Sequence, residues 1–168
     1  PSDRDDRVYI TEYVNPLLHE TGRVCSFEDD GIDMIPGVSR AESAWLDEGF
    51  NSYSTGKVMK RVYGPTLVQA LGLRLGELEG ARAQNSVDRM FDRIRSSSWG
   101  FSPGNYGFNS YARTQLTLLT FEGLVGEETM ARVMRTYHER WRFRHPSSDD
   151  FYAVVNEVSG QDLKWYFD

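Results

Sequence analysis

The residues whose side chains are best suited to catalysis or metal binding lie in the segment 45–53, which reads WLDEGFNSY. The pattern around it predicts a helix, and Glu48 on such a helix is either a solvated surface group or a metal ligand. Zinc binds a carboxylate oxygen at about 2.0–2.2 Å, and a catalytic zinc site keeps one coordination position for water. Gly49 removes a side chain beside this carboxylate, and the segment's aromatic residues are spaced so that at least two can anchor the helix in a core.

The segment 45–53 resembles the part of aminopeptidase N-type zinc peptidases, or gluzincins, that supplies the third zinc ligand. A tryptophan, a leucine, two acidic residues, a glycine and a phenylalanine, followed by a small polar residue and a tyrosine, are a specific signal of that family. The resemblance implies that Glu48 is a zinc ligand and that zinc is the cofactor.

The resemblance continues at residues 109–113, where the family has a tyrosine followed by x-Lys-Gly at the start of a helix. It implies that Tyr111 is the catalytic phenol that hydrogen-bonds the tetrahedral oxyanion, with Tyr106 as the nearby alternative. Here Arg113 and Thr114 replace the Lys-Gly pair, which keeps a cation and loses the glycine.

The helices expected after Tyr111 also resemble those of the family, so the resemblance covers about residues 41–168. It implies the helical lobe of a thermolysin-like metallopeptidase domain. The family's substrate-recognition strand, Gly-x-Met-Glu-Asn, is absent from the sequence.

The other half of the family's metal site is an H-E-x-x-H helix, and the chain contains no such motif. In the family's register, which leaves 18 residues between the motif and the glutamate, the two histidines fall on Cys25 and Asp29. Cysteine and aspartate can both bind zinc, and their i, i+4 spacing would place them on one helix face. Ser26 falls on the general base and cannot replace a glutamate that activates water. Cys25 and Asp29 therefore remain an alternative metal pair, and a lost or truncated site is the favoured interpretation.

The remaining histidines favour packing or surface roles. His138 and His145 lie in a region that contributes no ligands in the family, and His19 begins a motif whose second histidine is replaced by Arg23. The sequence contains no glycine-rich phosphate loop and no nucleophile-elbow motif.

Charge and hydropathy restrict the partners. The net charge of −6 opposes binding to a phosphate backbone, so no nucleic acid is expected. Basic residues gather only in 132–144, where interleaved aromatic residues at helical spacing predict an amphipathic helix with snorkelling arginines. No apolar run reaches the roughly 18 residues of a membrane span, so no membrane is expected. Cys25 is the only cysteine, which excludes an intramolecular disulfide and leaves the compartment open.

The patterns predict a mainly α protein with an irregular N-terminal segment, 1–40, and a helical peptidase-like domain, 41–168. A short strand is expected at 8–14 and a loop at 96–107. Ser147 and Asp150 suggest a capping box, and Gly160 suits the end of the helix that follows. The expected helices span 41–63, 65–80, 87–94, 109–122, 127–143, 147–159 and 161–167.

Together the resemblance implies a zinc-dependent aminopeptidase, a hydrolase that removes residues from the N-terminus of peptides. Because the H-E-x-x-H ligands and base are missing, the chain is expected to be incomplete and inactive in isolation. The alternative is a degenerate peptidase-like module with a binding or assembly role. Its partner would be the missing N-terminal lobe or another protein.

Overall fold

The computed structural model describes residues 43–64, 68–70, 73–87, 92–141, 144 and 146–167. The expected strand at 8–14 and the alternative metal pair, Cys25 and Asp29, lie outside these residues, as does the rest of the N-terminal segment. The described part is mainly helical, as predicted, with one small β-hairpin.

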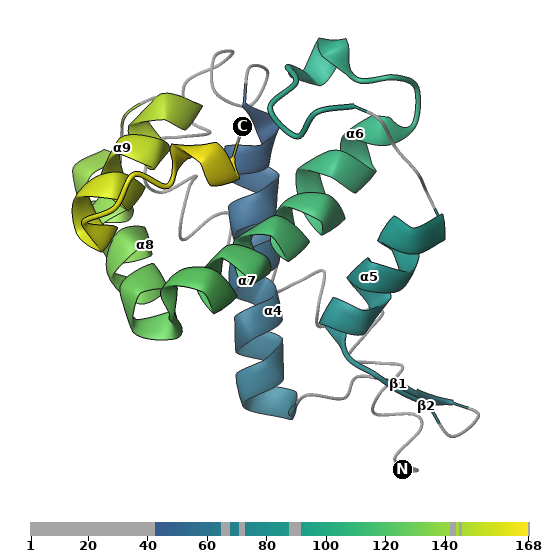
Figure 1. Ribbon diagram of the computed structural model, residues 1–168. Helices are drawn as coiled ribbons and strands as arrows, with labels where there is room; N and C mark the ends of the chain where they lie inside the picture. The colour runs from purple at the N-terminus through teal and green to yellow at the C-terminus, as the bar shows by residue number, and fades with distance from the viewer. Residues whose placement is uncertain are drawn as a thin grey trace.

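The helices are arranged around α4 (Phe50–Tyr63), which runs through the middle of the molecule (Figure 1). Helix α7 (Thr114–Val125) crosses it and packs against it. Helices α8 (Glu127–Trp141) and α9 (Ser148–Ser159) pack against each other on one side. Helix α5 (Glu77–Val87) lies on the other side with the hairpin (Figure 1). No helix in the described ranges has the length and apolar character needed to cross a bilayer.

The segment 45–53 forms the start of the central helix. Trp45–Gly49 is a π-helical segment, η3, that continues directly into α4. The predicted end at residue 63 is confirmed, because Gly64 follows with a φ of 87°. That left-handed conformation is accessible to glycine at little cost and breaks the helix.

The predicted helix at 65–80 is wrong at residues 68–70 and 73–76 and right at residues 77–80, and its other residues lie outside the described ranges. Strands β1 (Val68–Ala70) and β2 (Leu73–Leu75) pair antiparallel, with Val68 opposite Leu75. Only two residues connect these strands, which is the commonest length for a hairpin connection. The leucine spacing suggested a helix, but glycines at 72 and 76 lower helix propensity within it. Helix α5 begins at Glu77. The N–H of the preceding residue, Gly76, donates to Glu79 Oε2 in the first turn at 3.0 Å.

The predicted helix at 87–94 is also wrong in its described part. Val87 is the last residue of α5, and residues 92–96 form a turn in which the Ser96 N–H donates to the Arg93 carbonyl. The expected loop at 96–107 is confirmed for most of its length. It contains one 3₁₀ turn, Ser98–Gly100, and ends where a helix begins at Asn105.

The second long helix starts earlier than predicted. It begins as α6 (Asn105–Gly107), passes through the π-helical segment η5 (Phe108–Arg113) and continues as α7. Asn109, at the predicted start, and Ser110 are both buried inside the helix. Asn109 uses its amide to donate to the Asn105 carbonyl one turn back, at 3.0 Å.

The C-terminal predictions are largely confirmed. Glu127 and Glu128 occupy the first turn of α8, where the helix dipole favours acidic residues. Ser147 and Asp150 form the expected capping box of α9. Gly160 ends that helix with a φ of 69°. The helix expected at 161–167 is reduced to a single 3₁₀ turn, Lys164–Tyr166.

Helix α8 is amphipathic, as the basic stretch predicted. Met130, Val133 and Tyr137 are buried, whereas the helix's arginines are exposed. Because these arginines lie on the solvent side of an ordinary packing helix, the basic stretch needs no nucleic-acid partner to explain it.

Aromatic side chains dominate the core. Trp45 and Phe50 both pack edge-on against Phe151 of α9, with ring centroids 5.8 and 5.0 Å apart. The Trp45 indole N–H donates to Ser148 Oγ at 3.0 Å, which joins residues 103 positions apart. Aromatic pairs contribute about 0.5–1.5 kcal/mol each beyond the area they bury. The segment 45–53 therefore anchors the fold, and its three aromatic side chains are all buried.

The two π-helical segments touch at Gly49. A Cβ at this position would lie 2.0 Å from Thr114 Cγ2, 2.5 Å from Thr114 Cβ and 3.1 Å from the Ser110 carbonyl oxygen. Such distances leave no room for any side chain. The crossing of η3 and η5 therefore requires glycine at position 49.

We predict that Gly49→Ala lowers the free energy of unfolding by about 3 kcal/mol, because the methyl group overpacks the crossing. Thr114→Gly removes the opposing side chain, so the double variant Gly49→Ala/Thr114→Gly is expected to be more stable than the two single effects predict together. Chemical denaturation of the four proteins measures this coupling.

Gly123→Ala is the matched control, since a Cβ on this α7 glycine would meet no neighbouring atom within 4 Å. It is expected to change stability by less than about 1 kcal/mol, in the stabilising direction. Equal losses for Gly49→Ala and Gly123→Ala would show that the crossing tolerates a side chain.

Candidate functional site

Glu48 is buried in the π-helical segment η3, with 3% of its surface exposed. Asp47 beside it is buried to a similar degree. The Tyr106 hydroxyl donates to Glu48 Oε1 across a long 3.5 Å. Burial of a carboxylate is costly unless polar groups compensate it, so the setting of Glu48 differs from that of a solvated helix residue.

Two tyrosines face this region from the neighbouring helix. Tyr106 and Tyr111 contact each other edge-on, with ring centroids 6.5 Å apart. In a regular α-helix, residues five apart point about 140° away from each other. The wider turn of the π-helical segment η5 brings these two side chains back to one side.

Both phenol candidates lie in the described ranges. Tyr106, the alternative in the sequence, is the residue whose hydroxyl reaches the Glu48 carboxylate. Tyr111 lies beside the Tyr106 ring and is partly exposed. The five-residue spacing of the tyrosines gave no signal in the sequence, because it brings side chains together only in a π-helical turn.

Buried polar groups collect near the crossing of η3 and η5. Within the described residues, neither the Asn51 amide nor the Ser110 hydroxyl finds a hydrogen-bond partner, and both side chains are fully buried. An unsatisfied buried polar group costs about 1–3 kcal/mol. Such costs concentrate at functional sites more often than in packing cores.

The described residues do not by themselves fit a catalytic zinc ion. Such an ion needs three protein ligands, and no group of three His, Cys, Asp or Glu side chains comes together in this part of the chain. Glu48 is the one predicted ligand that lies in the described ranges. His138 is exposed on α8, as the sequence favoured.

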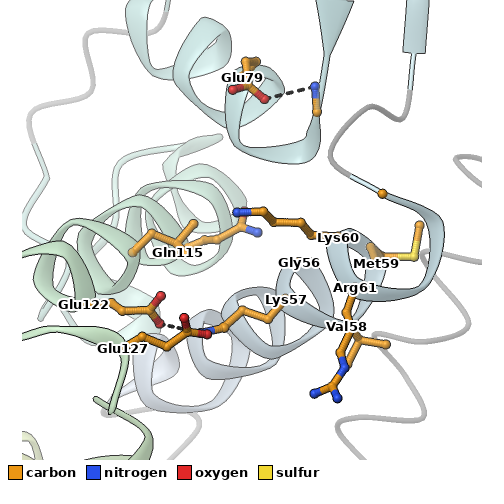
Figure 2. A pocket seen from close by; sticks show the side chains of 13 residues that line it. Gly56, Lys57, Val58, Met59, Lys60, Arg61, Glu79, Gln115, Glu122 and Glu127 are labelled. Carbon is orange, nitrogen blue, oxygen red and sulfur yellow. Dashed lines mark hydrogen bonds and ion pairs between the residues drawn. The ribbon is translucent and has the colours of Figure 1, made fainter. Parts of the chain in front are cut away.

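A solvent-connected cavity of about 630 Å³ lies elsewhere, along the C-terminal half of α4 (Figure 2). The start of α5 forms one wall, and α7 and the first residue of α8 form another. None of the candidate site residues in the described ranges lines it. The side chains that bound it include Lys57, Met59, Lys60, Gln115, Glu122 and Glu127.

One edge of this cavity is an ion-pair network centred on Lys57. Its ammonium donates to Glu122 Oε2 at 2.8 Å and to Glu127 Oε1 at 2.9 Å (Figure 2). The same Glu122 oxygen accepts a hydrogen bond from the Tyr53 hydroxyl. The network therefore joins α4 to both α7 and the start of α8.

The charges of the network support one another. Burial opposes the charge of Lys57, but hydrogen bonds to Glu122 and Glu127 outweigh it and raise the pKa of Lys57 above 10.5. The hydrogen bond from Lys57 lowers the pKa of Glu127 below 4.5. Burial, followed by the Glu122 hydrogen bond, raises the pKa of Tyr53 well above its usual range. All three groups thus keep their ordinary neutral-pH protonation states.

Comparison with protein-family models, with curated proteins and with solved structures finds no match for this chain. Its function must therefore be argued from the residues and the geometry described above.

We predict that Lys57→Met destabilises the protein by about 1–2 kcal/mol near neutral pH, because a partly buried hydrogen bond to Glu122 and an exposed one to Glu127 are lost. The difference from the native chain should shrink as pH falls below about 4.5, where Glu127 takes up its proton. The difference should also shrink as pH rises above about 10.5, because Lys57 then loses its proton in the native chain. Urea denaturation across this pH range measures the difference.

Arg140→Met is the control. Arg140 pairs with Glu157 at 2.8 and 2.9 Å, but both side chains are largely exposed. Solvent screens such a pair, so the expected loss is smaller than for Lys57→Met. An equal loss for both variants would contradict the special role of the Lys57 network.

Proposed function

We propose that this chain is the helical lobe of a zinc-dependent metallopeptidase domain of the aminopeptidase N type. In this proposal the lobe is incomplete by itself and inactive in isolation. The observation that supports it best is the crossing of η3 and η5. There a buried glutamate from the zinc-ligand signature accepts a hydrogen bond from Tyr106, the alternative phenol, which lies in α6 directly before η5.

Each group has a defined role in the proposal. Glu48 is the carboxylate ligand, held on a helix whose residues Trp45 and Phe50 belong to the aromatic core. Tyr106 and Tyr111 are the candidate phenols for the oxyanion of a peptide substrate. Because the described residues do not assemble three ligands, no catalytic step is assigned to a metal in this chain.

A second candidate function is a peptidase-like module that binds a protein and performs no catalysis. Two large aromatic side chains favour it, since Trp99 is 71% exposed and Trp165 is 65% exposed. Exposed tryptophans are common at protein interfaces. The partner would be the missing N-terminal lobe or another protein.

We predict that the isolated chain binds zinc only weakly and does not hydrolyse aminoacyl amides, since one carboxylate does not make a three-ligand site. Isothermal titration should show no stoichiometric binding at micromolar zinc. At millimolar zinc, backbone NMR signals around Glu48 should shift in the native chain and stay fixed in Glu48→Gln.

Glu128→Gln is the matched control, because Glu128 is an exposed glutamate in the first turn of α8. It should leave the zinc response at Glu48 unchanged. Zinc shifts confined to other regions, or equal in the native chain and Glu48→Gln, would refute the assignment of Glu48. Stoichiometric zinc with turnover would refute the claim that the lobe is incomplete.

A further inference from the structure

Asp92 organises the loop that precedes the tyrosine-bearing helix. Its carboxylate accepts hydrogen bonds from the Ser102 N–H at 2.7 Å and the Ser102 hydroxyl at 3.1 Å. It also accepts one from Asn105 Nδ2 at 2.7 Å. Donors from Asn105 and Ser102 lower the pKa of this carboxyl, so it stays ionised at neutral pH. Asp92 thus closes the loop 92–105 onto its own start.

The hydrogen bonds continue into a ring. The Asn105 carbonyl accepts from Asn109 Nδ2 at 3.0 Å, and Asn109 Oδ1 accepts from Arg113 Nη1 at 3.1 Å. Arg113 Nη1 also donates to the Asp92 carbonyl at 2.9 Å. Asp92, Asn105, Asn109 and Arg113 therefore form a closed ring, named here the Asp92 clasp. It also gives Arg113 a structural role.

The clasp runs along one side of the helix that contains α6 and η5. Its residues Asn105, Asn109 and Arg113 recur every four positions, whereas Tyr106 follows Asn105 directly and projects elsewhere. Phe101 of the clasped loop packs edge-on against the Tyr106 ring at 5.8 Å. The clasp thus fixes the helix's rotation and the loop beside Tyr106, and both determine where the tyrosine hydroxyl lies.

We propose that Asp92 is a positioning residue that acts through Asn105 to hold the Tyr106 hydroxyl against Glu48. Tyr106 then occupies Glu48 Oε1 and orients the carboxylate toward a ligand. The statement about ligand orientation rests on the proposed function. The coupling between Asp92 and Tyr106 does not, because it concerns the ligand-free chain.

The test uses the full chain labelled with tyrosine carrying ¹³C at the ζ carbon, without added metal. The Tyr106 signal is assigned as the one lost in Tyr106→Phe. Glu48→Gln should shift this signal, because the carboxylate beside the hydroxyl becomes an amide. In an Asp92→Ala background the same substitution should shift it by about half as much or less, since the two groups are no longer held together.

Asp162→Ala is the matched control. Asp162 also holds a surface loop, accepting from Asn156 Nδ2 at 3.1 Å and from the Lys164 N–H at 3.3 Å. Asp162→Ala should leave the response of Tyr106 to Glu48→Gln unchanged. If Asp92→Ala does not fold, Asp92→Asn keeps the volume and removes the charge, and it is measured in the same way.

A response of Tyr106 that is unchanged in the Asp92 variant, or reduced equally in Asp162→Ala, would overturn the proposal. Because the test is made without metal, a failure of zinc to bind at Glu48 does not affect it. The metal-free NMR test can therefore fail while the zinc assignment of Glu48 holds, and the zinc titration can fail while the coupling between Asp92 and Tyr106 holds.

Discussion

The contact between Gly49 and Thr114 is the constraint on which the rest of the structure depends. The backbone of the first helix passes so close to the second that a Cβ at position 49 would overlap the threonine side chain. The first helix is π-helical here as η3, the second changes from η5 to α7 at Thr114, and the approach brings η3 and η5 together. Glu48 precedes the glycine directly, so the same contact places its carboxylate opposite the helix that carries the tyrosines.

The energy that maintains this crossing comes from the aromatic core on the other side of α4. Trp45 and Phe50 flank Glu48 and Gly49 in sequence and pack against Phe151 of α9. The C-terminal turn adds Phe167, whose ring stacks on Tyr152 at 4.8 Å. Large apolar surfaces are thus buried immediately beside a polar site with unsatisfied groups. The favourable free energy of apolar burial offsets the cost of leaving those polar groups without partners.

Interactions over different sequence distances were predictable to different degrees. The capping box at Ser147 and the glycine end at Gly160 were predicted correctly because each depends on residues within one helical turn. The helix at 65–80 was predicted wrongly because four leucines at helical spacing are compatible with either structure, and the pairing of β1 with β2 decided it. The start of the second long helix at Asn105 was missed because its first turns are held by the Asp92 clasp, which starts 13 residues upstream of Asn105.

The sequence by itself determined the mainly α class, the burial of the segment 45–53 and the choice of Glu48 as the residue to examine. The class and the burial follow from periodicity and side-chain types, which are local properties of the chain. The choice of Glu48 followed from the resemblance of the segment 45–53 to the zinc-ligand segment of gluzincins. Only the tertiary structure decided that the Tyr106 hydroxyl reaches Glu48, and that Asp92 and Arg113 hold the helix that carries it. Those choices depend on the π-helical geometry and on contacts between separate segments, and neither is encoded in the spacing of the residues.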